Sequence, residues 1–467
     1  MQSKGDIIME DKIKEKILQQ YLNSDFNGLP FSEFAKHFDS VSDAKICIKK
    51  LVEDGDIDIV YNGTNPHIKG FDFSKNQEQF LSELLNVPDD LERELIRCGK
   101  IEIEVGNKYS CFCLYPSKKL LEQVNNNNRR ILEMPPFKKM LCFGAPQLEF
   151  VYFRIDVLDR YLEDPRYDIR YGDYYGQIYF NMDTEDNPED VYLKYFGIAY
   201  NIETRENLIC AFICDLAKMN DRHQYHFFSY MEQPNDKIVP EYNFYKNQIL
   251  GEWAEECSIF DAFLEEIKTI NKMTKIICNQ QLFINEFSDE DRKKLTNFHP
   301  FLKPTKKSFE LFCQTLDKLF TENLDSKVIL SMNKLNGSKM PLKYKPDGSL
   351  EMGSLALLKM FIETYFKPKT GENVAKMIID IWDRRETGIR AIRSKSSHFI
   401  RENQYDIKIF GEYNKIMYET YESVRLIRLV LANHPAVKLA KDNGSLKIPD
   451  WLFEGKIKNY FISPENN

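Results

Sequence analysis

Residues 408–433 read KIFGEYNKIMYETYESVRLIRLVLAN, and their apolar positions recur at steps of three and four residues. That spacing places the side chains on one face of an α-helix, and such a face must be covered by other helices. Pro435 is expected to end the helix, because proline lacks the N–H that a helix interior needs. The stretch therefore predicts a helical bundle, and the expected buried face carries Tyr413, Met417, Thr420, Val424, Ile427 and Leu431.

The rest of the bundle is predicted from the segments that precede this helix. Pro300 and Pro304, followed by Lys306 and Lys307, mark a linker. The bundle is predicted to span residues 306–440, followed by a C-terminal tail at 441–467. Its first three helices are expected at residues 308–323, 354–366 and 371 to about 393.

The N-terminal 75 residues have the pattern of a winged helix. The third expected helix carries Lys45, Lys49 and Lys50 on the side away from its apolar positions. In a DNA-binding module this helix would enter the major groove. Four acidic residues between 53 and 58 favour instead a protein partner or packing within the chain. The expected helices are 11–22, 32–38 and 43–55, followed by a strand at 57–61.

Residues 76–300 are predicted to form a mixed α+β middle domain. They are rich in Tyr and Phe, which could stack on bases but more often fill a core between strands. The fold class expected for the whole chain is therefore multidomain α+β, with a winged helix, a mixed middle domain and an all-α bundle. Strands of the middle domain are expected at residues 176–180, 192–200 and 209–216.

Composition limits where the protein works. The longest apolar runs fall far short of the roughly 20 residues that cross a membrane, and the first residues do not resemble a secretory signal. The ten cysteines include no pair at CxxC spacing, so we expect reduced thiols and no disulfides. These features predict a cytoplasmic protein without membrane contact.

Charge is unevenly distributed along the chain. Residues 306–467 hold 27 Lys and Arg against 20 Asp and Glu, a net charge of +7; since the whole chain carries −8, residues 1–305 carry −15. The basic C-terminal part could meet a polyanion. The acidic N-terminal half is where we expect a protein or nucleic-acid trigger to bind.

The segment between the third and fourth expected helices has the most suggestive chemistry. Residues 390–403 read RAIRSKSSHFIREN and bring Arg393 and His398 together with four residues between them. Two other Arg–His pairs have a similar spacing but lack flanking helices, so only Arg393 and His398 are taken as a candidate site. These other pairs are Arg292–His299 and Arg428–His434.

With this motif in a helical bundle, residues 306–440 resemble the HEPN superfamily of ribonuclease domains. The chain departs from the commonest motif, because Ser394 follows the arginine in place of Asn or Asp. The resemblance implies a metal-independent endoribonuclease without a cofactor, paired as a homodimer through the bundle. It also implies a role in antiviral abortive infection or as a toxin. The catalytic pair would be Arg393 and His398, and Arg390, Lys395 and Arg401 would bind RNA.

The expected chemistry follows from RNA itself. Its 2′-hydroxyl can attack the neighbouring phosphorus once a base takes its proton, and His398 is suited to that at neutral pH. Arg393 would hold the phosphoryl oxygens with two parallel hydrogen bonds. Two structural alternatives stay open. His398 could cap a helix while Arg393 pairs with a carboxylate such as Glu386, or the bundle could bind RNA without cutting it.

Helix geometry sets a further condition. Residues five apart on one helix project about 140° apart, so Arg393 and His398 do not easily reach one phosphate. Either the helix breaks within residues 394–397, or a second chain completes the site. His223 and His226, with Asp215 and Asp221 nearby, are the closest approach to a metal motif, but no third ligand has a convincing spacing, and we expect no metal.

Overall fold

The computed structural model spans the whole chain. It describes all residues except 1–3, 62–65, 69–71, 74–75, 88–93, 99–100, 106–111, 173, 182–186, 188, 254–256, 288–290, 292–293, 296, 333–338, 367–370, 399–401, 456 and 459–467, and it describes the backbone alone at 4–10, 94–98, 101–105, 257, 395–398 and 458. The chain folds into two compact units. The first comprises residues 1–157, 182–196 and 210–234, and the second comprises residues 158–181, 197–209 and 235–467. Among the described helices, none is both long and apolar enough to span a bilayer.

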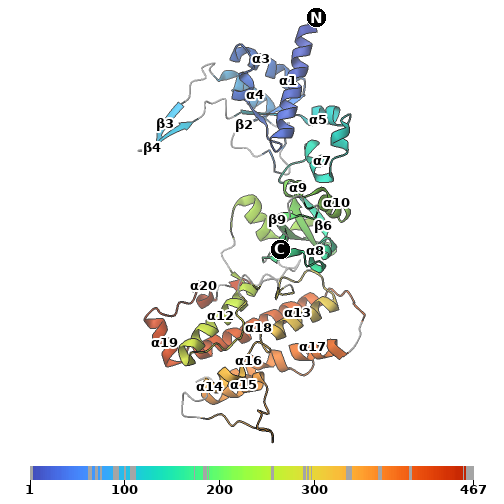
Figure 1. Ribbon diagram of the computed structural model, residues 1–467. Helices are drawn as coiled ribbons and strands as arrows, with labels where there is room; N and C mark the ends of the chain where they lie inside the picture. The colour runs from blue at the N-terminus through green and yellow to red at the C-terminus, as the bar shows by residue number, and fades with distance from the viewer. Residues whose placement is uncertain are drawn as a thin grey trace. The chain divides into compact units, whose positions relative to one another are not determined.

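The N-terminal part of the first unit packs helices against a small antiparallel sheet (Figure 1). Strand β5 (Phe112–Pro116) lies in the centre and pairs with β1 (Leu29–Pro30) and β2 (Ile57–Tyr61). A separate two-stranded ribbon joins β3 (Glu94–Cys98) to β4 (Ile101–Val105). The helices are α1 (Lys4–Asn23), α2 (Phe31–Ala35), α3 (Val41–Glu53) and α4 (Gln77–Asn86).

Helix α3 shows how the sequence sets this part of the fold. The Ser40 hydroxyl accepts a hydrogen bond from the Asp43 N–H, which satisfies one of the donors left open at a helix start. Ala44, Ile48 and Leu51 are fully buried in the core of this part. The predicted helix and its apolar face are therefore confirmed, whereas the winged-helix assignment stays a prediction.

The middle of the chain forms a six-stranded sheet of order β6-β10-β9-β8-β7, and β11 (Ile238–Pro240) pairs with one end of β9. All six residues of β10 are buried. In β9, Gly197 permits the ring of Phe244 to lie directly on the strand, where an added Cβ would come within 2.1 Å of that ring. The remaining strands are β6 (Phe150–Arg154), β7 (Tyr167–Tyr171), β8 (Tyr175–Phe180), β9 (Tyr192–Asn201) and β10 (Asn207–Phe212).

Short helices accompany this sheet and the chain before it. Helix α7 (Pro136–Cys142) packs against α9 (Ile213–Ala217) and α10 (Asp221–Ser229) within the first unit. Phe137 and Phe153 are fully buried there and meet edge to face. The aromatic residues of the predicted middle domain thus contribute to a core, as the sequence favoured. The other short helices are α5 (Lys118–Asn125), α6 (Arg129–Leu132), α8 (Asp159–Glu163) and α11 (Tyr242–Tyr245).

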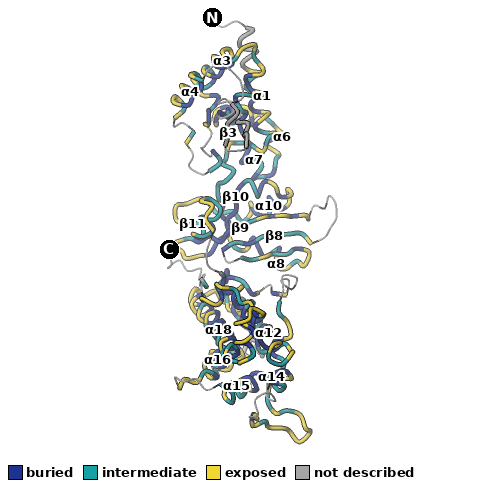
Figure 2. Tube along the Cα trace, turned by 90° about the vertical axis from the view of Figure 1, so that its left-hand side faces the viewer, coloured by how far each residue is buried: buried dark blue, intermediate teal, exposed yellow. Residues whose placement is uncertain are grey.

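Most of the second unit is a helical bundle around the long helix α18 (Ile409–Leu431). The predicted helix at 408–433 is confirmed to within two residues at each end. In Figure 2 the buried residues of the bundle lie where its helices face one another. The other helices are α12 (Ile259–Cys278), α13 (Lys306–Leu319), α14 (Ser326–Met332), α15 (Ser354–Tyr365), α16 (Val374–Asp383), α17 (Ile389–His398), α19 (Pro435–Asp442) and α20 (Asp450–Glu454).

Trp382 lies at the centre of the bundle and has no exposed surface. Its ring stacks on Phe320 at 4.1 Å, and its Nε1–H donates to the Ser423 hydroxyl at 2.8 Å. That hydroxyl donates in turn to the Ile378 carbonyl at 2.7 Å. These contacts join α16 to α18, and they satisfy the only polar atom of the indole ring.

The helix expected from residue 371 to about 393 is two helices, α16 and α17. Arg384 ends α16 with an extended backbone (ψ 126°), and its guanidinium is held by Asp380 at 2.6 Å. The turn that follows is tight: a Cβ on Gly388 would lie 2.6 Å from the Arg384 carbonyl oxygen. The break therefore needs glycine at residue 388, and α17 starts directly after it.

The bundle also extends beyond the predicted residues 306–440. Helix α12, which the sequence prediction placed in the middle domain, packs along α18 and shares its core. Leu446 and Leu452, which lie in the expected C-terminal tail, are buried in that core as well. What the structure confirms of the fold class is a mixed α and β protein with antiparallel sheets.

Candidate functional site

The candidate segment lies on α17, which packs against α13 and α16. Arg390, Arg393, Lys395 and His398 all belong to this helix, and it is continuous as far as His398. Of the two alternatives that helix geometry left open, a break within residues 394–397 is therefore ruled out. The side chains of Lys395 and His398 and the whole of Arg401 lie outside the described part of the chain.

Arg393 meets two carboxylates near the end of α13. Its Nη1 donates to Asp317 and, at 2.7 Å, to Glu322. The Asp317 side chain is 1% exposed, whereas those of Arg393 and Glu322 are 43% and 46% exposed. The hydrogen bond with Asp317 is the main reason that the pKa of Arg393 is raised. The guanidinium is thus anchored by a buried carboxylate, while 43% of the arginine side chain is exposed.

Asp317 is itself held from a second direction. The Thr321 hydroxyl donates to its Oδ1, while Arg393 uses its Oδ2. The backbone closes around it too, because the Glu322 N–H donates to the Asp317 carbonyl at 3.1 Å. A buried carboxylate with both oxygens bonded fixes the direction of the arginine it holds.

Arg390 has a more open environment. Its Nη1 lies 3.4 Å from an Asp383 carboxylate oxygen, and both side chains are more than half exposed. Nearby, Arg384 bonds Asp380 and reaches Glu419 at 3.2 Å. Arg384 and Arg390 are therefore paired with acidic residues of α16 and α18.

The second Arg–His pair of similar spacing is structural. Arg428 is 3% exposed and forms an ion pair with Glu266, which has no exposed surface. It also donates to the Leu452 carbonyl at 3.5 Å. His434 caps α19, where its Nδ1 accepts the Ala436 N–H at 3.2 Å. Arg428 therefore joins α18 to α12, and His434 caps α19.

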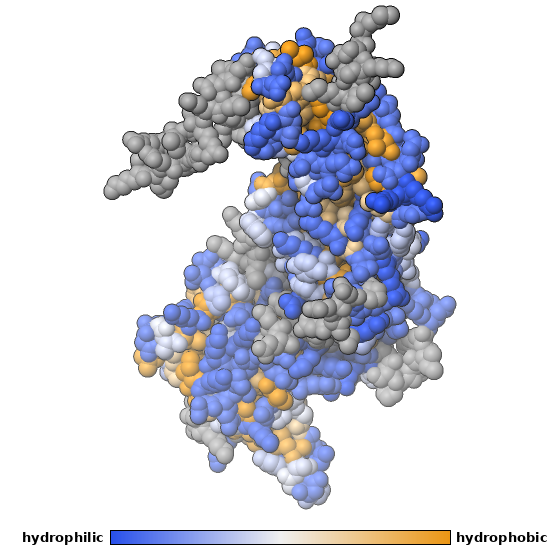
Figure 3. All heavy atoms as spheres, turned by 45° about the horizontal axis from the view of Figure 1, so that its top comes forward, coloured by the Kyte–Doolittle hydropathy of each residue, from blue (hydrophilic) through white to orange (hydrophobic). Residues whose placement is uncertain are grey.

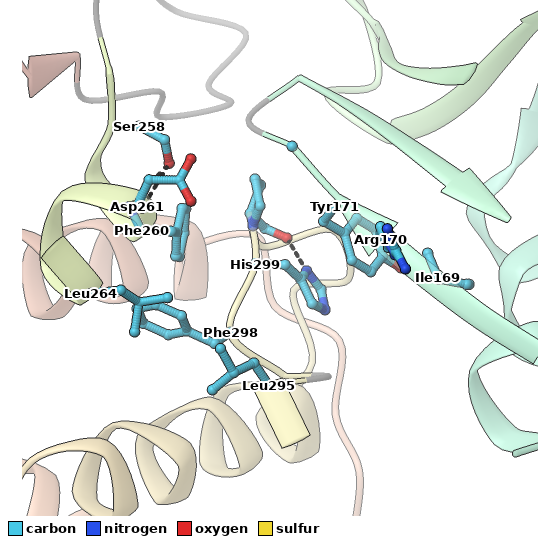
Figure 4. A pocket seen from close by; sticks show the side chains of 12 residues that line it. Ile169, Arg170, Tyr171, Ser258, Phe260, Asp261, Leu264, Leu295, Phe298 and His299 are labelled. Carbon is cyan, nitrogen blue, oxygen red and sulfur yellow. Dashed lines mark hydrogen bonds between the residues drawn. The ribbon is translucent and has the colours of Figure 1, made fainter. Parts of the chain in front are cut away.

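His299, from the third pair, lines a small pocket of about 60 Å³ (Figure 4). Its ring stacks on Tyr171 at 4.1 Å, and its Nδ1–H donates to the Pro300 carbonyl at 2.6 Å. Phe260 and Phe298 lie on the opposite side of the pocket. Loss of solvent lowers the pKa of His299 to about 4, so the imidazole is neutral at pH 7. Arg292 lies outside the described residues.

His223 and His226 do not converge on a common point. On α10, His223 Nε2 bonds the Glu189 carbonyl at 3.1 Å, and His226 Nε2 bonds the Val157 carbonyl at 2.9 Å. Within the described ranges no group of three or more His, Cys, Asp or Glu is placed to hold a metal ion. The cysteines described there are free thiols.

The three lysines predicted to lie together on one side of α3 do not all lie there. Lys45 is 7% exposed, and its ammonium donates to the carbonyls of Leu85 (3.3 Å) and Val87 (2.5 Å). Lys49 lies 3.9 Å from Glu53 on the same helix. The placement of Lys45 on the side of the helix away from its apolar positions was therefore wrong, because its stem packs inward and its ammonium group is satisfied by the main chain.

Sequence reasoning missed Asp317 and Glu322 altogether. They precede Arg393 by more than 70 residues, and nothing in the spacing of the chain connects them to it. No family model matches the chain, nor does any curated protein or any solved structure.

Proposed function

We propose that the chain is a metal-independent endoribonuclease whose site is carried by α17. The observation that supports it best is the setting of Arg393: a buried carboxylate holds the guanidinium in place while 43% of the side chain is exposed. An arginine that is held in place and partly exposed is suited to stabilise a phosphoryl group. His398, on the same helix, would be the general base. Arg390, Lys395 and Arg401 would add positive charge along the RNA backbone.

In the proposed reaction His398 takes the proton of an RNA 2′-hydroxyl. The 2′-oxygen then forms a bond to the adjacent phosphorus, and the bond from phosphorus to the 5′-oxygen breaks. That oxygen leaves with a proton from a second imidazole or from water. Arg393 stabilises the charge that builds on the phosphoryl oxygens. The products are a 2′,3′-cyclic phosphate and a 5′-hydroxyl.

A continuous α17 makes a composite site the simpler arrangement. Arg393 and His398 project about 140° apart on such a helix, so one phosphate would meet Arg393 of one chain and His398 of another. A homodimer through the bundle would supply both. Exposed apolar residues of the bundle are available for such contacts, among them Met377, Tyr418, Leu429 and Leu439. Figure 3 shows apolar patches on the face of the molecule that it draws.

The test is cleavage of single-stranded RNA by the purified protein in excess EDTA. Arg393→Ala and His398→Ala should each abolish cleavage, whereas His434→Ala, at a helix cap, should not. A mixture of the Arg393→Ala and His398→Ala proteins should recover part of the activity, since a heterodimer can hold one complete site. RNA methylated at the 2′-oxygen should resist. Efficient cutting of DNA, or cleavage by His398→Ala at the full rate, would contradict the proposal.

A second candidate function is favoured by the same ion pairs. Arg393 ties α17 to Asp317 of α13 and to Glu322. Joining these segments is then the whole role of the arginine, with no part in catalysis. The chain would then be a regulator or adaptor, with a winged-helix-like N-terminal part that meets a partner and a bundle that only dimerises or binds RNA. Absence of cleavage together with RNA binding would select this function. For an active enzyme we propose a role in antiviral abortive infection or as a toxin.

A further inference from the structure

The two carboxylates on Arg393 differ in a way that suggests different roles. Both meet the same nitrogen, Nη1, which has two hydrogens to donate. A phosphate that used this nitrogen would therefore have to displace one of the two carboxylates. Which one leaves depends on how firmly each is held.

Asp317 is the firmly held partner. Its side chain is 1% exposed, it lies on α13, and its second oxygen accepts the Thr321 hydroxyl. To leave Arg393 it would have to remain charged inside the bundle without its cation. Such a separation is strongly unfavourable, because it leaves a buried carboxylate without the cation that pairs with it.

Glu322 is the loosely held partner. It follows α13 in a turn, its side chain is 46% exposed, and its carboxylate lies 2.7 Å from Arg393 Nη1. Its backbone N–H is already satisfied by the Asp317 carbonyl. The side chain can therefore rotate into water without any change in the main chain, and hydration would replace what it loses.

We infer that Asp317 positions Arg393 for RNA phosphate, whereas Glu322 occupies the phosphate position and competes with RNA. This inference rests on the proposed function and deepens it. Removal of the two carboxylates then has opposite effects. Without Glu322 the phosphate has no competitor, so RNA binds more tightly. Without Asp317 the guanidinium loses its direction, so RNA binds less tightly and the transition state is less well stabilised.

The experiment measures binding and cleavage separately. Binding is followed by fluorescence anisotropy with a single-stranded RNA that is 2′-O-methylated throughout, since it lacks the attacking hydroxyl. Cleavage is followed with the unmodified RNA in EDTA. Glu322→Gln should lower Kd about threefold. Asp317→Asn should raise Kd and lower kcat at least about tenfold.

Two controls separate this effect from overall charge and from folding. Glu363→Gln removes one negative charge from α15, where Glu363 lies 3.9 Å from Lys359, and should leave Kd unchanged. In an Arg393→Ala background, Glu322→Gln should no longer tighten binding. If Asp317→Asn unfolds, Thr321→Val serves instead: it removes the hydroxyl that holds Asp317 and should weaken binding in the same direction, about threefold.

The outcomes distinguish this inference from the function on which it rests. If no RNA is cut but the two Kd changes have opposite signs, the ribonuclease proposal fails and the roles of the two carboxylates stand. If RNA is cut but Glu322→Gln weakens binding, or still tightens it in the Arg393→Ala background, the competing role is overturned. A chain that does not bind the methylated RNA has no phosphate site at Arg393, and the inference fails.

Discussion

Two arginines of the bundle each meet a buried carboxylate, yet they differ in their access to solvent. Arg428 of α18 is 3% exposed and is paired with Glu266 of α12. Arg393 of α17 is 43% exposed and is paired with Asp317 of α13. The two come from sequence motifs of nearly equal spacing to a histidine, so the motif alone does not separate them.

The difference shows that the surroundings of an arginine decide what it can do. At Arg428 both charges are removed from water, and burial raises the pKa of Glu266 even with a cation beside it. Such a pair joins two helices but can meet no ligand. At Arg393 one carboxylate partner is buried and the other, that of Glu322, is 46% exposed, so the same chemistry holds a helix while 43% of the arginine side chain stays exposed.

The largest effect that tests this contrast is on stability. Arg428→Ala leaves the Glu266 carboxylate buried without its partner, and we expect the free energy of unfolding to fall by about 3–5 kcal/mol. Urea denaturation followed by circular dichroism measures it.

The control for this prediction removes both charges together. Arg428→Met combined with Glu266→Leu replaces the ion pair by apolar groups and should recover most of the loss. If Arg428→Ala has the same urea midpoint of unfolding as the wild-type protein, the Arg428–Glu266 ion pair does not stabilise the fold.

A smaller effect is expected from His299, the histidine of the third motif. Its pKa is about 4 when folded and about 6.5 when unfolded. Between these values the unfolded chain binds more protons, so stability is full above pH 6.5 and falls as the pH drops towards 4. From pH 7 to pH 5 this group should remove about 2 kcal/mol.

His299→Gln should lose that part of the pH dependence, because glutamine can still donate to the Pro300 carbonyl but does not titrate. Urea denaturation of both proteins at pH 7 and pH 5 makes the comparison. Equal losses in the two proteins would mean that His299 is solvated and ordinary.

Periodic apolar residues carried most of what could be predicted of the fold. Residues 413–431 repeat at three and four positions, and α18 lies where that pattern placed it. The break between α16 and α17 could not be predicted from apolar periodicity, because it depends on a tight turn that needs the small size of Gly388. The place of α12 in the bundle depends on which of several apolar faces pair in space, which periodicity does not encode.

The candidate site was predictable only in part, for a similar reason. Arg393 and His398 are close in sequence, so spacing could suggest them. Asp317 lies on another helix, and a buried aspartate in an amphipathic pattern looks like an ordinary polar position until the fold brings its cation to it. Lys45 shows the opposite error: its sequence position looked exposed, but carbonyls of a segment 40 residues away draw it inward.

The smallest predicted effect tests the solvent-facing side of Arg393 directly. In a double-mutant cycle on the free energy of unfolding, Arg393→Ala and Glu322→Gln should show a coupling energy of about 0.2–1 kcal/mol at low salt. The value is small because both side chains are more than two-fifths exposed. Between roughly 0.05 M and 0.5 M salt the Debye length falls to a few ångströms, so this coupling should shrink by half or more. The coupling between Arg428 and Glu266 should stay constant, because salt ions do not enter the core. If both couplings respond to salt equally, the contrast between a solvent-facing and a buried arginine pair does not hold in solution. If neither responds, Glu322 is held as firmly as Asp317 and could not give way to a phosphate.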